Sequence, residues 1–139
     1  MEMEITVGIV EDHSEFRQGL GFLVSAVPGY EVAWAYGSAE EALKTGCEVD
    51  VMLLDINLPG LSGIEAVSLF KKRFPGQKII MLTILEDAGH IVNAISRGAD
   101  GYILKKAHPQ RIIEAIQQVY DGGAALTPVV ARHVLECFK

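Results

Sequence analysis

The sequence predicts an α/β fold: a doubly wound, five-stranded parallel sheet built from five βα units, with helices on both faces. Short apolar runs alternate along the chain with segments whose apolar residues recur at helical spacing, which is typical of βα repeats. Most of these runs are apolar without interruption, as expected for strands buried on both faces. The chain has 139 residues, half of them apolar, which is enough for one domain with a hydrophobic core.

Five strands are expected, and one of them differs from the rest. Residues 31–36 alternate Val32 and Trp34 with alanines, a period of two that indicates a less buried strand, as at the edge of a sheet. The predicted strands comprise residues 5–10, 31–36, 51–54, 79–82 and 102–104.

A helix is expected after each strand, and local signals mark the ends of several. Ser14 and Ser38 are the expected N-caps of the first two helices, and Pro109 after His108 opens the fifth, where proline is tolerated. The fourth helix has the weakest apolar stripe, which favours a mobile element. The expected core-facing residues are Phe16, Leu20, Leu23, Val24 and Val27, then Ile64, Val67, Phe70 and Phe74, then Ile91 and Ile95, and finally Ile112, Ile113, Ile116 and Val119.

One more helical stretch is expected at the C-terminal end. It begins at Thr127-Pro128 and carries Val130, Val134 and Phe138 at helical spacing, and the chain stops inside this pattern. We therefore divide the chain into a domain over residues 1–124 and a helical extension, or the start of a linker, over residues 125–139.

Composition excludes several classes of function. The net charge of -6 argues against strong direct binding to nucleic acid. Cys47 and Cys137 are the only cysteines and lack metal-site spacing, so neither a disulfide framework nor a zinc site is expected. The first residues carry no basic signal region, and no apolar stretch approaches the roughly 18 residues that span a bilayer. A cytoplasmic protein without a membrane segment fits best.

Reactive side chains follow four of the predicted strands, at the sheet edge where open parallel sheets form their ligand crevice. Glu11 and Asp12 follow the first strand, Asp55 the third, Thr83 the fourth and Lys105 the fifth. Two carboxylates roughly 5 Å apart repel by about 3 kcal/mol at an effective dielectric near 20, so this cluster needs protonation or a cation. Hard carboxylate oxygens suit Mg²⁺.

Asp55 is the candidate nucleophile at this edge. With a cation in place, a carboxylate can attack a phosphoryl group, as in aspartyl-phosphate chemistry. The Lys105 ammonium could reach one phosphate oxygen, and Thr83 could donate a hydrogen bond to another. Lys106 is expected to be only a surface charge.

With these motifs, the chain resembles the receiver domains of two-component response regulators. The match covers essentially the whole chain: the acidic pair after the first strand, Asp55 with Pro59-Gly60 after the third, Thr83 after the fourth and Lys105 after the fifth. Three stretches, Glu11-Asp12-His13, residues 98–106 and Leu126-Thr127-Pro128, resemble the NarL/FixJ (LuxR-type) subfamily in particular. One departure is Glu11, where many members carry aspartate.

The resemblance implies a flavodoxin-like fold and Mg²⁺-dependent transfer of a phosphoryl group to Asp55 from a sensor histidine kinase. Glu11 or Asp12 and the backbone carbonyl of Asn57 would help Asp55 to hold Mg²⁺. Small acyl phosphates could also donate. Such a domain is not an enzyme on other substrates, because it promotes only its own phosphorylation and dephosphorylation.

The resemblance also implies a switch. Thr83 would move towards the phosphoryl group and Tyr102 would change rotamer, altering the face made by the fourth and fifth helices and the fifth strand; Tyr102 could equally be a core residue. The output in this subfamily is a C-terminal helix-turn-helix domain that binds DNA, and no residues for it follow Lys139. The chain is then a receiver excised from a transcription factor or a stand-alone regulator, and homodimerisation is a further family expectation.

Other functions fit less well. A haloacid-dehalogenase-type phosphatase needs a general acid two residues after its nucleophile, where this chain has Asn57. A dinucleotide-binding domain needs a glycine-rich first turn, where this chain has residues 11–14, Glu-Asp-His-Ser. A phosphorylation-independent scaffold for protein interactions stays as the alternative, although no site residue is missing. Within the receiver interpretation, Leu85 is expected to hinder the access of water to the phosphoryl group.

Overall fold

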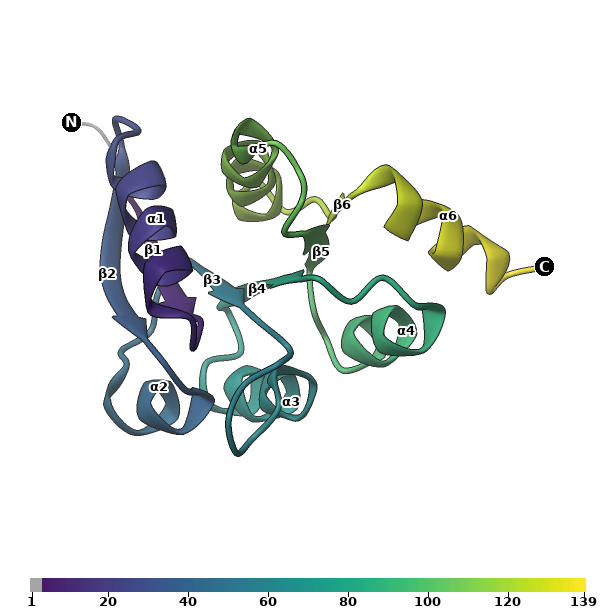
Figure 1. Ribbon diagram of the computed structural model, residues 1–139, viewed down its shortest axis with the longest axis horizontal. Helices are drawn as coiled ribbons and strands as arrows, with labels where there is room; N and C mark the ends of the chain where they lie inside the picture. The colour runs from purple at the N-terminus through teal and green to yellow at the C-terminus, as the bar shows by residue number, and fades with distance from the viewer. Residues whose placement is uncertain (1–3) are drawn as a thin grey trace.

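A six-stranded parallel sheet lies between two layers of helices in the computed structural model, which describes residues 4–139 (Figure 1). The strand order is β2-β1-β3-β4-β5-β6, and every neighbouring pair is parallel. The winding reverses after β2, which makes the sheet doubly wound and confirms the predicted fold class. The predicted number of five strands is wrong by one.

The elements alternate along the chain as βα units. The strands are β1 (Ile5–Val10), β2 (Tyr30–Tyr36), β3 (Val51–Leu54), β4 (Lys78–Thr83), β5 (Gly101–Leu104) and β6 (Ala125–Leu126). The helices are α1 (Ser14–Ser25), α2 (Ala39–Thr45), α3 (Gly63–Arg73), α4 (Ala88–Ser96), α5 (Pro109–Tyr120) and α6 (Pro128–Glu136).

Each face of the sheet has its own hydrophobic core. Helices α1 and α5 cover one face, and α2, α3 and α4 cover the other (Figure 1). Successive strand residues alternate between the two cores: in β3, Val51 and Leu53 face α1 and α5, whereas Met52 and Leu54 face the opposite layer. This double burial explains the uninterrupted apolar runs.

The alternating strand β2 lies at the sheet edge, as predicted. Trp34 is buried, whereas Ala33 and Ala35 are exposed. The Trp34 ring lies against Gly8 of β1, where an added Cβ would be only 2.5 Å from the ring atoms. Glycine at this position therefore makes room for the one tryptophan of the chain.

Histidines cap two of the helices, which corrects one prediction. Ser14 is the first residue of α1 and not its N-cap; His13 is the cap, and its Nδ1 accepts a hydrogen bond from the backbone N–H of Phe16 at 3.3 Å. Histidine is not among the usual capping residues, so the nearby serine was the expected choice. His108 caps α5 through its own Nδ1, and Ser38 caps α2 as predicted.

The C-terminal segment packs on the sheet. The two-residue strand β6 pairs with β5, and it is too short to be visible as a sequence pattern. Thr127, which follows β6, makes two hydrogen bonds to β5. Its N–H donates to the Tyr102 carbonyl at 3.2 Å, and its hydroxyl accepts from the Leu104 N–H at 3.1 Å. Val130 is fully buried, but Phe138 lies beyond the end of α6 and is 84% exposed, so the expected stripe does not reach it.

No helix in residues 4–139 has both the length and the apolar character that crossing a membrane requires.

Candidate functional site

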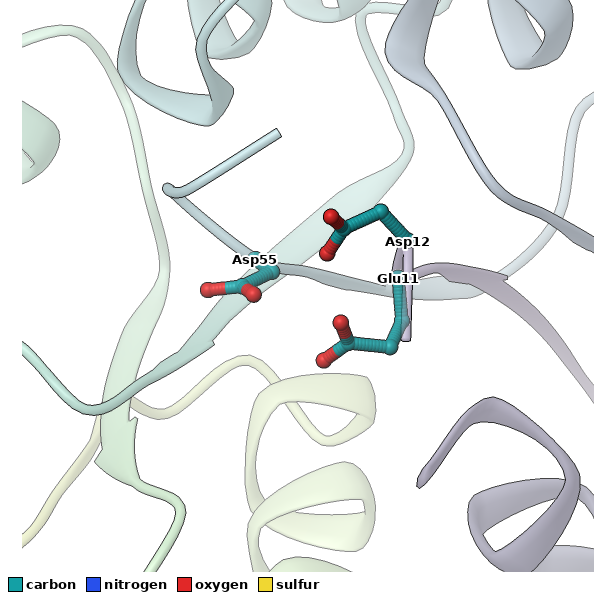
Figure 2. Close-up of side chains that lie close together, drawn as sticks. All are labelled: Glu11, Asp12 and Asp55. Atoms are coloured by element: carbon teal, nitrogen blue, oxygen red, sulfur yellow. The ribbon is translucent and has the colours of Figure 1, made fainter. Parts of the chain in front are cut away.

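The carboxyl ends of β1 and β3 bring three carboxylates together. One oxygen atom each from Glu11, Asp12 and Asp55 lies within 4.8 Å of the others, and Figure 2 shows the three side chains side by side. The strand order in the sheet explains this, because β1 and β3 are neighbours there although β2 lies between them in the chain. The predicted acidic cluster is therefore confirmed as a geometric fact.

Asp55 is held in one orientation. Its side chain is almost buried, at 4% residue exposure, and its Oδ1 accepts a hydrogen bond from the backbone N–H of Ile56 at 2.7 Å. Its Oδ2 accepts a hydrogen bond from Lys105 Nζ at 3.0 Å. Both oxygens therefore have a donor, and the carboxylate is fixed at the strand end.

Glu11 is buried more deeply than its neighbour Asp12. Glu11 is 2% exposed, whereas Asp12 is exposed. The Glu11 Oε2 accepts from the His13 N–H at 3.0 Å, and its backbone carbonyl accepts from Arg17 Nη1 at 2.7 Å. The pKa of Glu11 is raised, mainly because burial disfavours its charged form, and the nearby charge of Asp55 raises it further. The hydrogen bonds from Lys105 and His13 oppose this rise in part.

Lys105 is the cation of the site. Its Nζ lies 2.5 Å from Glu11 Oε1 and 3.0 Å from Asp55 Oδ2, and 4.7 Å from the centre of the Phe16 ring. Burial lowers the pKa of Lys105, but the hydrogen bonds and charges of Glu11 and Asp55 outweigh it and raise the pKa above the ordinary value. Lys106 instead forms an exposed ion pair with Glu86, as expected of a surface charge.

Thr83 and Tyr102 are linked to each other through one residue, Leu85. Both side chains are fully buried. The Thr83 hydroxyl accepts from the Leu85 N–H at 3.3 Å, and the Tyr102 hydroxyl donates to the Leu85 carbonyl at 2.6 Å. Burial, with the charges of Asp87 and Asp55, raises the pKa of Tyr102, so its hydroxyl stays a donor. Within residues 4–139, no hydrogen bond joins Thr83 to Asp55.

An open cavity lies over the carboxylates. Its lining consists of Glu11, Asp12, His13, Phe16, Asp55, Asn57, Ile84 and Lys105. Leu85 is absent from this lining and packs against the hydrophobic core on the α2, α3 and α4 face of the sheet, while its neighbour Ile84 reaches the cavity.

Sequence reasoning missed three contributors to this site: His13, Phe16 and Ile84. The His13 backbone N–H binds Glu11, the Phe16 ring contacts the Lys105 ammonium, and Ile84 lies at the rim. Ile84 follows the strand end at Thr83, and that position could have drawn attention to it. Phe16 gives no such signal, because its spacing matches an ordinary core face.

Comparison with known proteins identifies the class. The response regulator receiver domain family matches residues 7–117, so the chain belongs to that family. Among curated proteins, it is 31% identical over 140 residues to the transcriptional regulatory protein DegU of Brevibacillus brevis, covering 99% of this chain and 59% of that protein. It is 35% identical over 129 residues to the transcriptional regulatory protein UhpA of Escherichia coli K12, covering 91% of this chain and 64% of that protein.

A solved structure agrees with this assignment. The two-component response regulator of the LuxR family from Aurantimonas sp. SI85-9A1 superposes with a TM-score of 0.89 at 28% identity, covering 97% of this chain and 98% of that one. The relatives are of the NarL, DegU and UhpA type, as the sequence resemblance predicted. The chain spans between 57% and 64% of the lengths of the curated relatives it matches.

Proposed function

We propose that Asp55 is the phosphoacceptor of this receiver domain and takes a phosphoryl group from a sensor histidine kinase. A carboxylate oxygen of Asp55 attacks the phosphorus, the bond from phosphorus to the donor nitrogen breaks, and the imidazole leaves with the electron pair. The outcome is a mixed anhydride on Asp55. The domain promotes this step and the later hydrolysis on itself alone.

The position of Lys105 is the observation that carries this proposal. An ammonium held between Glu11 and Asp55 compensates their charge before phosphorylation. The same ammonium lies next to the carboxylate that would carry the new phosphoryl group, so it can move to one of the phosphoryl oxygens without a large displacement. A lysine with only a structural role would not need to line the open cavity.

The donor set fits Mg²⁺. Oxygens of Glu11, Asp12 and Asp55 lie close together at the cavity, and hard carboxylate ligands with room for water suit this ion. Asn57 also lines the cavity, and its backbone carbonyl is the fourth ligand that we propose. When bound, Mg²⁺ would neutralise charge on the carboxylates and on the transferred group.

Thr83 and Tyr102 form the switch in this proposal. Thr83 donates its hydroxyl hydrogen to the phosphoryl group, which pulls on the Leu85 backbone that it shares with Tyr102. Moving a two-state population from 1:99 to 99:1 takes about 5.5 kcal/mol of differential binding, so several contacts must change together. The resulting structural change alters the face made by α4, α5 and β5.

The names of the relatives support a proposal for the output domain and the partners of this receiver. The relatives bear the names of transcriptional and nitrate/nitrite response regulators. We propose that the receiver, residues 1–124 with the extension 125–139, controls a DNA-binding helix-turn-helix domain in the cytoplasm and forms a homodimer when phosphorylated.

Intact mass spectrometry tests the phosphoacceptor directly. The chain is incubated with acetyl phosphate, with and without Mg²⁺, next to Asp55→Asn and to Asp12→Asn as a cavity variant that keeps the nucleophile. We expect a Mg²⁺-dependent gain of one phosphoryl group in the native chain and none in Asp55→Asn. A gain that persists in Asp55→Asn would contradict the proposal. A folded native chain without any gain would favour the phosphorylation-independent scaffold.

A further inference from the structure

The loop between β3 and α3 carries Asn57, whose backbone carbonyl is the proposed fourth ligand of Mg²⁺. Ile56 closes the base of this loop, because its carbonyl accepts from the N–H groups of Leu58 at 3.0 Å and of Gly63 at 2.9 Å. Residues 59–61 form the tip of the loop, and no backbone–backbone hydrogen bond in the described part of the chain involves them. The backbone of the tip therefore depends on another restraint.

Glu40, in the first turn of α2, supplies that restraint. Its Oε2 accepts a hydrogen bond from the Leu61 N–H at 3.0 Å, although Glu40 precedes Leu61 by 21 residues. Within residues 4–139, no other side chain from outside the loop forms a hydrogen bond with residues 57–62. The side chains of Leu58 and Leu61 also pack against the core, but hydrophobic contact is non-directional. The bond to Glu40 is therefore what fixes the orientation of the tip.

Gly60 allows the tip to lie directly against the Glu40 carboxylate. Its φ of 73° is in the left-handed region, and a Cβ added to it would overlap a carboxylate oxygen of Glu40. An ionised carboxylate is also a stronger acceptor than a neutral oxygen. Two features of neighbouring residues, the close approach at Gly60 and the hydrogen bond at Leu61, thus place Glu40 against the tip.

The position of the tip affects Asn57, because the loop is short and closed at its base. The end of the loop is fixed close to the phosphoacceptor, since a Cβ added to Gly63 would overlap the Asp55 carbonyl. Asn57 lies between this fixed base and the tip, and it lines the cavity over the carboxylates. Mg²⁺ demands near-ideal octahedral geometry, so a shift of one carbonyl ligand weakens its binding. Groups that orient metal ligands from behind therefore change metal affinity.

We propose that Glu40 is a positioning residue of the phosphorylation site, which holds the loop between β3 and α3 so that the Asn57 carbonyl stays in place to bind Mg²⁺. Glu40 does not line the cavity and acts only through the loop backbone. Its loss raises the Mg²⁺ concentration that the site needs but leaves the reaction at saturating Mg²⁺ unchanged. The inference rests on the proposed Mg²⁺ site and on Asp55 as the phosphoacceptor.

Three variants separate the hydrogen bond of Glu40 from its charge. Glu40→Ala removes both, and Glu40→Gln removes the charge but keeps an acceptor oxygen. Glu41→Ala is the matched control, because it removes a second exposed carboxylate from the same turn of α2. Thermal unfolding at increasing Mg²⁺ concentrations, without a phosphoryl donor, gives the dissociation constant of Mg²⁺ for each protein. Intact mass after incubation with acetyl phosphate gives the phosphorylation rate at saturating Mg²⁺.

We expect Glu40→Ala to bind Mg²⁺ about tenfold more weakly than the native chain, with Glu40→Gln and Glu41→Ala within about twofold of it. The phosphorylation rate at saturating Mg²⁺ should be the same in all four proteins. Unchanged Mg²⁺ affinity in Glu40→Ala, or an equal loss in Glu40→Gln or Glu41→Ala, would overturn the positioning role while leaving Asp55 as the phosphoacceptor. A native chain that neither binds Mg²⁺ nor gains a phosphoryl group would overturn the proposed function as well.

Discussion

The two halves of the site are built differently. The acidic half, on β1, β3 and β5, is tied by Lys105 to both buried carboxylates at 2.5 and 3.0 Å, and Asp55 also accepts from the next backbone N–H. In the hydroxyl half, on β4 and β5, the Thr83 hydroxyl accepts a single, longer hydrogen bond of 3.3 Å from the Leu85 N–H. The difference indicates a fixed reaction centre next to an element that can move, as a switch requires.

Removing the cation of the acidic half should have the largest effect on stability. Lys105→Ala leaves Glu11 and Asp55 buried without their cation, and we expect a loss of about 2 to 3 kcal/mol in the free energy of unfolding, because the open cavity admits some water. Lys106→Ala, which removes only an exposed pair with Glu86, should change it by about 0 to 1 kcal/mol. Urea unfolding measures both, and equal effects would refute the special role of Lys105.

The C-terminal segment supports the hydroxyl half, since Val130 is buried in the same core as Tyr102. Val130→Ala should lower the free energy of unfolding by about 2 kcal/mol through lost contacts and a cavity. Its neighbour Val129 is 47% exposed, so Val129→Ala should stay within about 0.5 kcal/mol. Thermal unfolding of the pair would show whether α6 belongs to the folded unit; identical melting temperatures would mean that it does not.

Tyr102→Phe removes one hydrogen bond from the hydroxyl half and leaves the Leu85 carbonyl without its donor. We expect a cost of about 1 kcal/mol in the free energy of unfolding. Tyr36→Phe is the control, because Tyr36 stacks on Trp34 and its hydroxyl makes no hydrogen bond within residues 4–139. A Tyr102 effect no larger than that of Tyr36 would mean that the link through Leu85 carries little energy.

A smaller effect should appear in the pH dependence of the free energy of unfolding. The folded protein raises the pKa of Glu11 above 4.5, so it binds a proton more tightly than the unfolded chain does. The contribution of Glu11 to stability therefore falls as pH rises from 4.5 through its folded pKa. Glu11→Gln should remove this part of the slope, whereas Asp12→Asn should not. Denaturant midpoints measured at intervals of pH test this, and parallel curves for native and Glu11→Gln proteins would count against it.

The elements that depend on repeated spacing were predictable from sequence, and those that depend on single contacts were not. Uninterrupted strands such as β3 were visible because both faces are buried, and Asp55, Thr83 and Lys105 were found because they follow such strands. β6 was missed because two residues carry no period, and the His13 cap because histidine rarely serves there. The contact of Ile84 with the cavity depends on how β4 and β5 lie side by side.

Hydrogen–deuterium exchange before and after phosphorylation tests the central contrast most directly. The fixed acidic half predicts that residues 51–56 keep their protection, while residues 83–91 and 101–104, which contain the bonds of Thr83, Leu85 and Tyr102, change theirs. The Asp55→Asn protein, treated in the same way, should show no change in either segment. A change confined to residues 51–56, or spread evenly over the sheet, would contradict a fixed centre beside a moving switch.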